Sequence, residues 1–186
     1  MLLVFASFII FYMEFIFAQI LGAIALIVIC VGYFVKQKPL FLILQVVGNV
    51  FYGGAFLILN SVSAGIITLI STLRCIYIFV AEKYNLKYTL YFLSIFVAAY
   101  ICVGILFWQQ WFDFIPIITA TLFTIGYYVK NMNLMRYILL VPNAMLVFYC
   151  IMCKTYTSAL LDFIEFSVII IAIIKFKKQN NKSKIT

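Results

Sequence analysis

The sequence has no histidine, and Asp, Glu, Lys and Arg make up only 10% of its 186 residues. The absence of histidine excludes imidazole proton relays, histidine metal ligands and a Ser-His-Asp triad. The P-loop, HExxH and GxSxG motifs are also missing, which removes ATP-driven transport by this chain and the common hydrolases. We therefore expect no enzyme, no cofactor and no metal site.

Hydrophobic residues make up 68% of the chain, and the mean hydropathy is +1.22. Such a chain has too little polar surface to cover a water-soluble globule. The apolar runs are as long as helices and lack the alternation of barrel strands, so we expect an all-α membrane protein. Breaks at charged, Asn, Gln and Pro residues predict about seven spans of roughly 20 residues each. The predicted spans are 17–35, 40–59, 61–81, 86–107, 112–129, 134–152 and 156–174.

Basic residues predict how these spans are oriented. They follow the first, third, fifth and seventh spans, and the last group is a lysine-rich tail at 178–186. Because positive loops stay in the cytoplasm, seven crossings place the N-terminus outside and the C-terminus inside. The tail can lie on anionic lipid, and we expect no nucleic-acid partner. An apolar segment at 1–14 leaves room for one further short or interfacial segment.

Part of the sequence is repeated. The stretch "GYFVKQKPLFLILQVVGN" from Gly32 is followed 94 residues later by "GYYVKNMNLMRYILLVPN" from Gly126. Each copy begins in one span, turns, crosses back, turns again and crosses once more. We therefore expect two parallel three-helix repeats, 15–83 and 111–177, joined by a linker helix at 84–110.

This 3+1+3 plan, with an Asn in the second helix of each triplet, resembles the superfamily of SWEET sugar facilitators, PQ-loop proteins and PnuC vitamin-precursor transporters. Within it, "QVVGNVFYGGAFLILNSVSAGIITLISTLRCIYIF" is most similar to the YgjV-type bacterial inner-membrane proteins. The resemblance covers roughly residues 22–177 and implies a transporter in the bacterial cytoplasmic membrane. The PQ dipeptide is absent, and the WxxW of PnuC-type sites falls in an outer loop, at Trp108 and Trp111. We therefore infer no vitamin specificity.

Glycine and proline occupy matching places in the two halves. In the 94-residue register Gly22 corresponds to Pro116, and Gly48 corresponds to Pro142. Paired helix breakers in a transporter point toward the substrate site, where unwound backbone can face a cavity. Close helix packing through small residues is the alternative explanation.

Amide side chains lie near the middle of the second span of each half, at Asn49 and Asn143. Gln45, Asn49 and Tyr52 share one helix face because they are four and three residues apart. We expect these residues and Asn143 to bind a polar substrate, with Tyr149 also in the pocket wall. Hydrogen bonds that only hold helices together are the alternative.

Ionisable residues inside predicted spans are the strongest departure from a plain helix bundle. Arg74 lies in the third span, and Asp162 and Glu165 lie three residues apart in the seventh. A charge at the bilayer centre costs on the order of 2.5 to 3.5 kcal/mol on insertion scales, so such groups face the bundle interior and pair. We predict a salt bridge from Arg74 to one of the acids, which leaves one carboxylate to carry a proton or attract a cation. A structural pair that only fixes helix register is the alternative.

These features favour a transporter or facilitator of a small polar metabolite that works by alternating access between the two repeats. A membrane scaffold or receptor without transport activity is the alternative from another class. An intramembrane enzyme that uses Asp162 and Glu165 as paired acids is disfavoured, because no nucleophile or metal set accompanies them.

Overall fold

The computed structural model describes residues 2–59, 62–84, 86, 89–108 and 110–182. Over these residues the chain forms seven α-helices, one 3-10 turn and no strand. The helices are α1 (Leu2–Tyr33), α2 (Lys38–Ile58), α3 (Val62–Tyr84), α4 (Thr89–Leu106), α5 (Phe114–Tyr128), α6 (Met132–Met152) and α7 (Tyr156–Lys182), and the turn η1 (Trp111–Asp113) precedes α5. The prediction of an all-α chain with about seven helices is confirmed.

Four of the described helical segments are long and apolar enough to cross a membrane: Tyr12–Tyr33, Lys38–Ile58, Ala64–Tyr84 and Met132–Met152. Tyr91–Leu106 in α4 is a shorter apolar helix. The 15 residues of α5 span about 22 Å at the usual helical rise, which is less than a bilayer core of about 30 Å. The apolar part of α7 is interrupted by its two acids.

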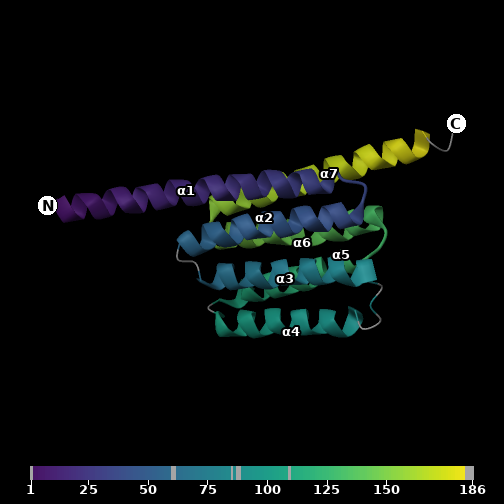
Figure 1. The fold of residues 1–186 in the computed structure, drawn as a ribbon, viewed down its shortest axis with the longest axis horizontal. Helices are drawn as coiled ribbons and strands as arrows, with labels where there is room; N and C mark the ends of the chain where they lie inside the picture. The colour runs from purple at the N-terminus through teal and green to yellow at the C-terminus, as the bar shows by residue number, and fades with distance from the viewer. Residues whose placement is uncertain (1, 60–61, 85, 87–88, 109, 183–186) are drawn as a thin grey trace.

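The first helix is continuous. It runs for 32 residues from Leu2 to Tyr33 without a break, so residues 2–14 are the start of α1 and do not form a separate segment. Figure 1 shows this part of α1 extending past the ends of the neighbouring helices.

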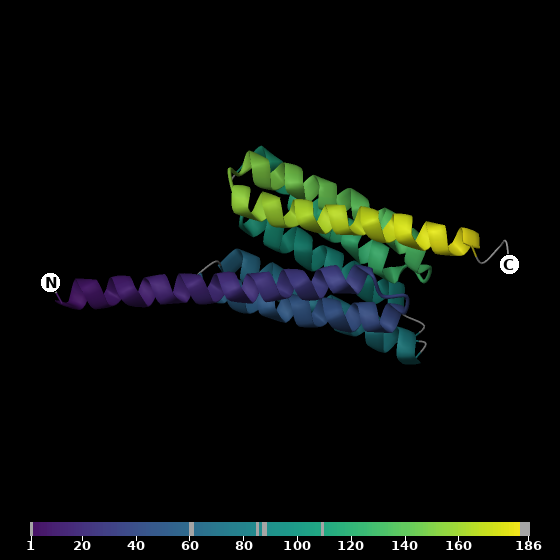
Figure 2. The ribbon, with the colours of Figure 1, turned by 90° about the horizontal axis from the view of Figure 1, so that it is seen from above.

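Helices that follow one another in the chain pack against each other. The closest pairs are α1 with α2, α2 with α3, α5 with α6, and α6 with α7, whereas α4 contacts α3 and α5. Figure 2 shows α1 to α3, in purple and blue, beside α5 to α7, in green and yellow. We name these the α1–α3 group and the α5–α7 group. They also meet where α1 contacts α7 and where α3 contacts α5.

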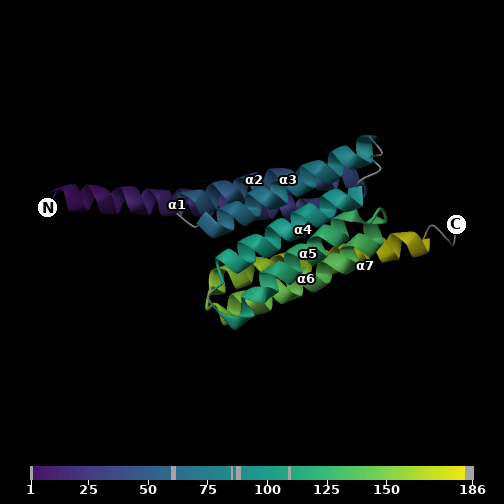
Figure 3. The same cartoon turned by 90° about the horizontal axis from the view of Figure 1, so that it is seen from below.

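The linker position of α4 is visible from two sides. Figure 1 shows α1 and α7 along one side of the bundle and α4 on the opposite side, and Figure 3 shows α4 running beside α3 and α5. The relation of the two groups as internal repeats stays a prediction.

The bundle has two distinct ends. The N-terminal end carries the α2–α3, α4–α5 and α6–α7 connections, and the C-terminal end carries the other three connections and the end of α7 (Figure 1). Lys36, Lys83, Lys130 and Lys175 lie at the C-terminal end, whereas Lys154 lies at the other. The predicted grouping of basic residues is therefore present, and its orientation across the membrane stays a prediction.

The best-packed part of the bundle lies toward the C-terminal end. Its buried core consists of Ile29, Tyr33, Phe41, Leu42, Cys75, Ile78, Leu93, Tyr127, Met135, Leu139, Ile169 and Ala172. These residues come from the C-terminal halves of α1, α3 and α5, the middle of α7 and the N-terminal halves of α2, α4 and α6. A continuous apolar core therefore closes this half of the bundle.

None of the four predicted helix breakers interrupts a helix. The α1 helix continues through Gly22 and α2 continues through Gly48, while Pro116 lies in the first turn of α5. A first-turn N–H has no partner within its helix, so proline costs no hydrogen bond there. Gly48 instead permits close packing, because a Cβ at this position would collide with the side chain of Ile29. Pro142 also lies inside a continuous helix, α6, where its missing N–H removes one hydrogen bond.

Candidate functional site

A cavity of about 600 Å³ lies between the α1–α3 group and the α5–α7 group. Its described lining comes from α1, α2, α3, α5, α6 and α7, and none of it from α4. Leu59 at the end of α2 and Ser158 in the first turn of α7 line it at the N-terminal end. Tyr33 and Tyr127, which belong to the buried core, line it at the other. The cavity therefore extends from the middle of the bundle toward the N-terminal end.

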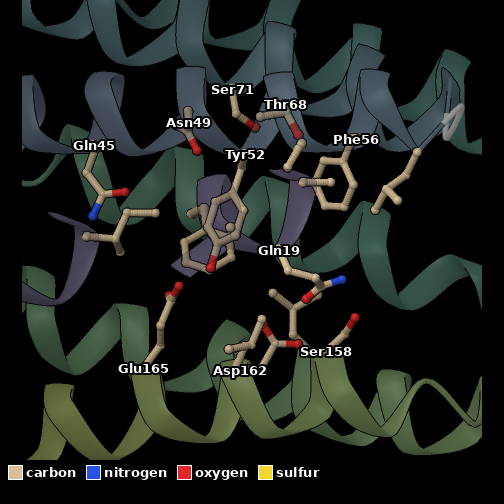
Figure 4. Close-up of a pocket in the computed structure, with 18 of the residues that line it drawn as sticks. Gln19, Gln45, Asn49, Tyr52, Phe56, Thr68, Ser71, Ser158, Asp162 and Glu165 are labelled. Atoms are coloured by element: carbon tan, nitrogen blue, oxygen red, sulfur yellow. The ribbon is translucent and has the colours of Figure 1, made fainter. Parts of the chain in front are cut away.

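Polar side chains of α2 and α3 form one wall. The three residues predicted to share a face of α2, Gln45, Asn49 and Tyr52, all line the cavity. Thr68 and Ser71 of α3 line it beside them, as Figure 4 shows. The amide groups and hydroxyls of this wall can both donate and accept hydrogen bonds.

The two acids of α7 form the facing wall. Figure 4 shows Glu165 directed toward the hydroxyl of Tyr52, and Asp162 near Gln19 and Ser158. The Asp162 Oδ2 atom accepts a hydrogen bond of 3.2 Å from the thiol of Cys150. Within the part of the chain that the structure describes, no three acid or cysteine side chains gather as a metal site requires.

Arg74 also lines the cavity but does not pair with the acids. Its side chain is only 3% exposed, and Nη1 donates to the Ala120 carbonyl at 3.2 Å and to the Thr124 hydroxyl at 3.0 Å. The guanidinium carbon lies 4.9 Å from the centre of the Tyr127 ring and 5.6 Å from that of Tyr100. A carbonyl, a hydroxyl and an aromatic ring of α5 and a second aromatic ring of α4 thus take the place of a carboxylate.

The predicted salt bridge from Arg74 to Asp162 or Glu165 is therefore wrong. The described residues contain one ion pair, between Lys38 and Glu82. Two carboxylates thus line the cavity, and no cationic side chain of the described residues forms an ion pair with either of them.

Two residues predicted to bind substrate lie outside the cavity. Asn143 is 1% exposed and is not among the residues that line the cavity. Its Nδ2 donates to the Leu139 carbonyl at 2.7 Å, and its side chain lies beside Tyr33. Tyr149 instead donates to Asp113 Oδ1 at 3.4 Å near the end of α6. Of the predicted breakers, Gly22 alone lines the cavity, and a Cβ there would meet no atom within 4 Å.

On the C-terminal side of the cavity, Arg136 of α6 forms hydrogen bonds with the end of α1. It is 1% exposed, and it donates from Nε to the Tyr33 carbonyl at 3.0 Å and from Nη2 to the Val35 carbonyl at 2.7 Å. Asn133 accepts a third bond of 3.1 Å, and the ring of Phe176 lies 4.0 Å from the guanidinium carbon. Carbonyls at a helix C-terminus lack partners within the helix, so a cation is favoured there.

Lys38 makes the corresponding hydrogen bond from α2 to the end of α5. Its buried ammonium pairs with Glu82 of α3 and donates to the Tyr128 carbonyl at 3.3 Å. Each group of helices thus provides a basic residue that caps the first helix of the other group. Both residues belong to the basic residues that were predicted to follow the first and fifth spans. A signal was available for Arg136, because it lies inside the predicted 134–152 span.

Gln19 and Ser158 also line the cavity, and neither was among the predicted site residues. Gln19 lies in the apolar run at the start of the chain. It is the single amide side chain in residues 1–35, and an isolated amide in a membrane span is itself a sign of an interior-facing position.

Comparison with known families identifies the chain. A family model of bacterial inner membrane proteins, Imp-YgjV, matches residues 16–180. The chain therefore belongs to the Imp-YgjV family of bacterial inner membrane proteins, as the resemblance to YgjV-type proteins implied. No curated protein and no solved structure matches it. Its place in the SWEET, PQ-loop and PnuC superfamily stays a prediction.

Proposed function

We propose that this member of the Imp-YgjV family is a carrier or facilitator of a small polar solute, and that the cavity is its binding site. One observation carries the proposal. A cavity of about 600 Å³ lies inside an apolar helix bundle and is lined by amide, hydroxyl and carboxylate groups. Pockets of roughly 300 to 1,000 Å³ hold small-molecule ligands. Ionisable groups inside a membrane bundle are costly and mark substrate or ion pathways by default.

Alternating access is the mechanism we propose for it. The cavity extends toward the N-terminal end, whereas Arg136 and Lys38 join the two groups of helices at the C-terminal end. A second state, open at the C-terminal end, requires these bonds to break and the two groups to rotate around the cavity. The proposed 3+1+3 repeat and the resemblance to the SWEET, PQ-loop and PnuC superfamily support such a rocking motion.

The basic residues support an orientation for this cycle. Positive residues are retained on the cytoplasmic side, and they gather here at the C-terminal end. We therefore propose that the N-terminus is outside, the C-terminus is inside, and the structure is the outward-facing state.

A scaffold or receptor is the second candidate function. The exposed side chains of Lys175, Lys177 and Lys178 at the end of α7 favour it, because clustered lysines attract anionic lipid or an acidic partner. In this case the polar cavity would have no solute to bind.

Uptake by the reconstituted chain tests the proposal. Proteoliposomes are supplied with labelled sugars, nucleosides, amino acids and vitamin precursors, and we expect one class to accumulate. Asn49→Leu removes an amide from the cavity wall and should abolish this uptake. Val47→Leu, on the exposed side of the same helix, is the matched control and should leave it unchanged. A folded chain that takes up no class would contradict the carrier and favour the scaffold.

A further inference from the structure

We propose that the cavity binds a solute that carries a protonated amine, with the ammonium held by Asp162 and Glu165 against the ring of Tyr52. The inference rests on the proposed function, because it names the class of solute for the same site.

The charges of the lining are not balanced. The lining contains two acids and one base, Asp162, Glu165 and Arg74, so with the acids ionised its net charge is minus one. Arg74 is already held by α5 and by aromatic rings. A carboxylate that is removed from water without a compensating charge is strongly unfavourable. A monocationic solute would supply the compensating charge in this cavity.

The two carboxylates converge on one volume. Asp162 and Glu165 are three residues apart, so they project from the same side of α7, and Figure 4 shows both directed into the cavity. An ionised carboxylate has about four acceptor positions, and an ammonium has three donors. The donors described at these acids are the Cys150 thiol and the Tyr52 hydroxyl. Acceptor positions therefore remain for the N–H groups of a bound amine.

Aromatic rings complete the cation site. Tyr52 and Phe56 stack with ring centres 6.2 Å apart and an interplanar angle of 19°, and both line the cavity. A cation is attracted to the face of an aromatic ring within about 6 Å. The guanidinium of Arg74, 4.9 Å from the centre of the Tyr127 ring, already uses this interaction in the same cavity.

A further polar group points to the opposite end of the solute. Gln45 lines the closed end of the cavity at 3% exposure, and its Oε1 accepts from the Tyr127 hydroxyl at 3.2 Å. Among the described residues its Nε2 has no hydrogen-bond partner. A buried donor without an acceptor is costly, and an oxygen on the solute would satisfy it. We therefore expect an amine that also carries a hydroxyl, carbonyl or carboxylate oxygen.

Pairs of probes that differ only in the amine test this inference on the full chain in detergent. The pairs are tyramine with tyrosol, and 4-amino-1-butanol with 1,4-butanediol, because each neutral partner replaces the ammonium by a hydroxyl. A ligand that binds the folded state raises the melting temperature, and the stabilisation grows with the logarithm of one plus the ratio of ligand concentration to Kd. We expect each amine to raise it, and each neutral partner to bind at least tenfold more weakly.

Variants locate the amine. Glu165→Gln should weaken amine binding at least tenfold, and Asp162→Asn should weaken it to a smaller degree. Glu14→Gln removes an exposed carboxylate of α1 that does not line the cavity, so it should leave the affinity unchanged. If a variant does not fold, the comparison of amine with alcohol on the unmodified chain decides the question.

The outcomes separate the two proposals. Equal binding of tyrosol and tyramine, or of the two butane derivatives, would overturn the amine class and leave the carrier intact. Binding and uptake of neutral sugars or nucleosides alone would do the same. Absence of binding and uptake for the amines and for every neutral class would overturn both.

Discussion

The two ends of the helix bundle differ in how its halves are joined. At the C-terminal end, Arg136 caps α1 and Lys38 caps α5, so each group of helices holds the other. At the N-terminal end, the bonds from Tyr149 to Asp113 and from Cys150 to Asp162 stay within the α5–α7 group. Two basic residues near the starts of α2 and α6 therefore join the two groups of helices at the C-terminal end, and the bonds named at the other end do not join them.

Packing follows the same division. The buried core lies toward the C-terminal end, and the cavity extends from this core toward the N-terminal end. Among the described residues, side-chain bonds that cross between the two groups start from Lys38, Arg74, Tyr127 and Arg136, and the Tyr52 hydroxyl of α2 also contacts Glu165 of α7. In the proposed transport cycle, we expect opening of the C-terminal end to be the costly step.

The largest effect is expected from Arg136→Leu. The change leaves the Tyr33 and Val35 carbonyls buried without their donor and removes a cation from a helix C-terminus. We expect a loss of about 2 to 4 kcal/mol in the free energy of unfolding, measured by chemical unfolding in detergent. Arg136→Lys keeps the charge but not the forked donors, so it should recover part of this loss. Unchanged stability in the leucine variant would show that Arg136 does not hold the two groups of helices together.

A smaller effect is expected from Lys38→Met. This variant removes the bond to the Tyr128 carbonyl and leaves Glu82 without its partner. We expect a loss of about 1 to 2 kcal/mol. Because part of this loss comes from the unpaired acid, Lys38→Met combined with Glu82→Gln should be more stable than the sum of the single changes predicts. Strict additivity in the unfolding data would contradict the pairing, and Lys36→Met, at an exposed position, is the control.

Leu59→Trp tests the entrance. Leu59 lines the cavity at the end of α2, so a larger side chain there should obstruct the path of a solute. The residue is exposed, and surface changes usually alter stability by less than about 0.5 kcal/mol. We expect slower uptake with little change in melting temperature. Leu57→Trp lies two residues away, is exposed and does not line this cavity, so it should affect neither. Equal slowing by both variants would argue against an entrance at Leu59.

Much of the fold was predictable because lipid requires backbone groups to be satisfied within helices. Runs of apolar residues interrupted by polar ones therefore gave the seven helices and most of their bounds. The acids of α7 and the polar face of α2 were also predictable as interior positions, since intramembrane charge and helical spacing constrain them.

The partners of polar groups were not predictable in the same way. Charge alone suggested that Arg74 pairs with an acid, but aromatic faces and a carbonyl of α5 satisfy it instead. Likewise Gly48 looked like a breaker and serves close packing against Ile29. These outcomes depend on which helices are neighbours and at what rotation, and a single sequence does not contain that information in local patterns.

The smallest effect is expected from deleting residues 177–186. The deletion retains Phe176, whose ring lies 4.0 Å from the Arg136 guanidinium carbon, so the contacts of Arg136 at the C-terminal end stay intact. It removes the exposed residues Lys177 and Lys178, which belong neither to the cavity lining nor to the described core. For a carrier, solute uptake per folded molecule and melting temperature should both stay unchanged, measured in the same proteoliposomes and detergent as the full chain. A scaffold that binds through this tail would instead lose its partner, so loss of cellular function with uptake unaltered would separate the tail's role from that of the cavity.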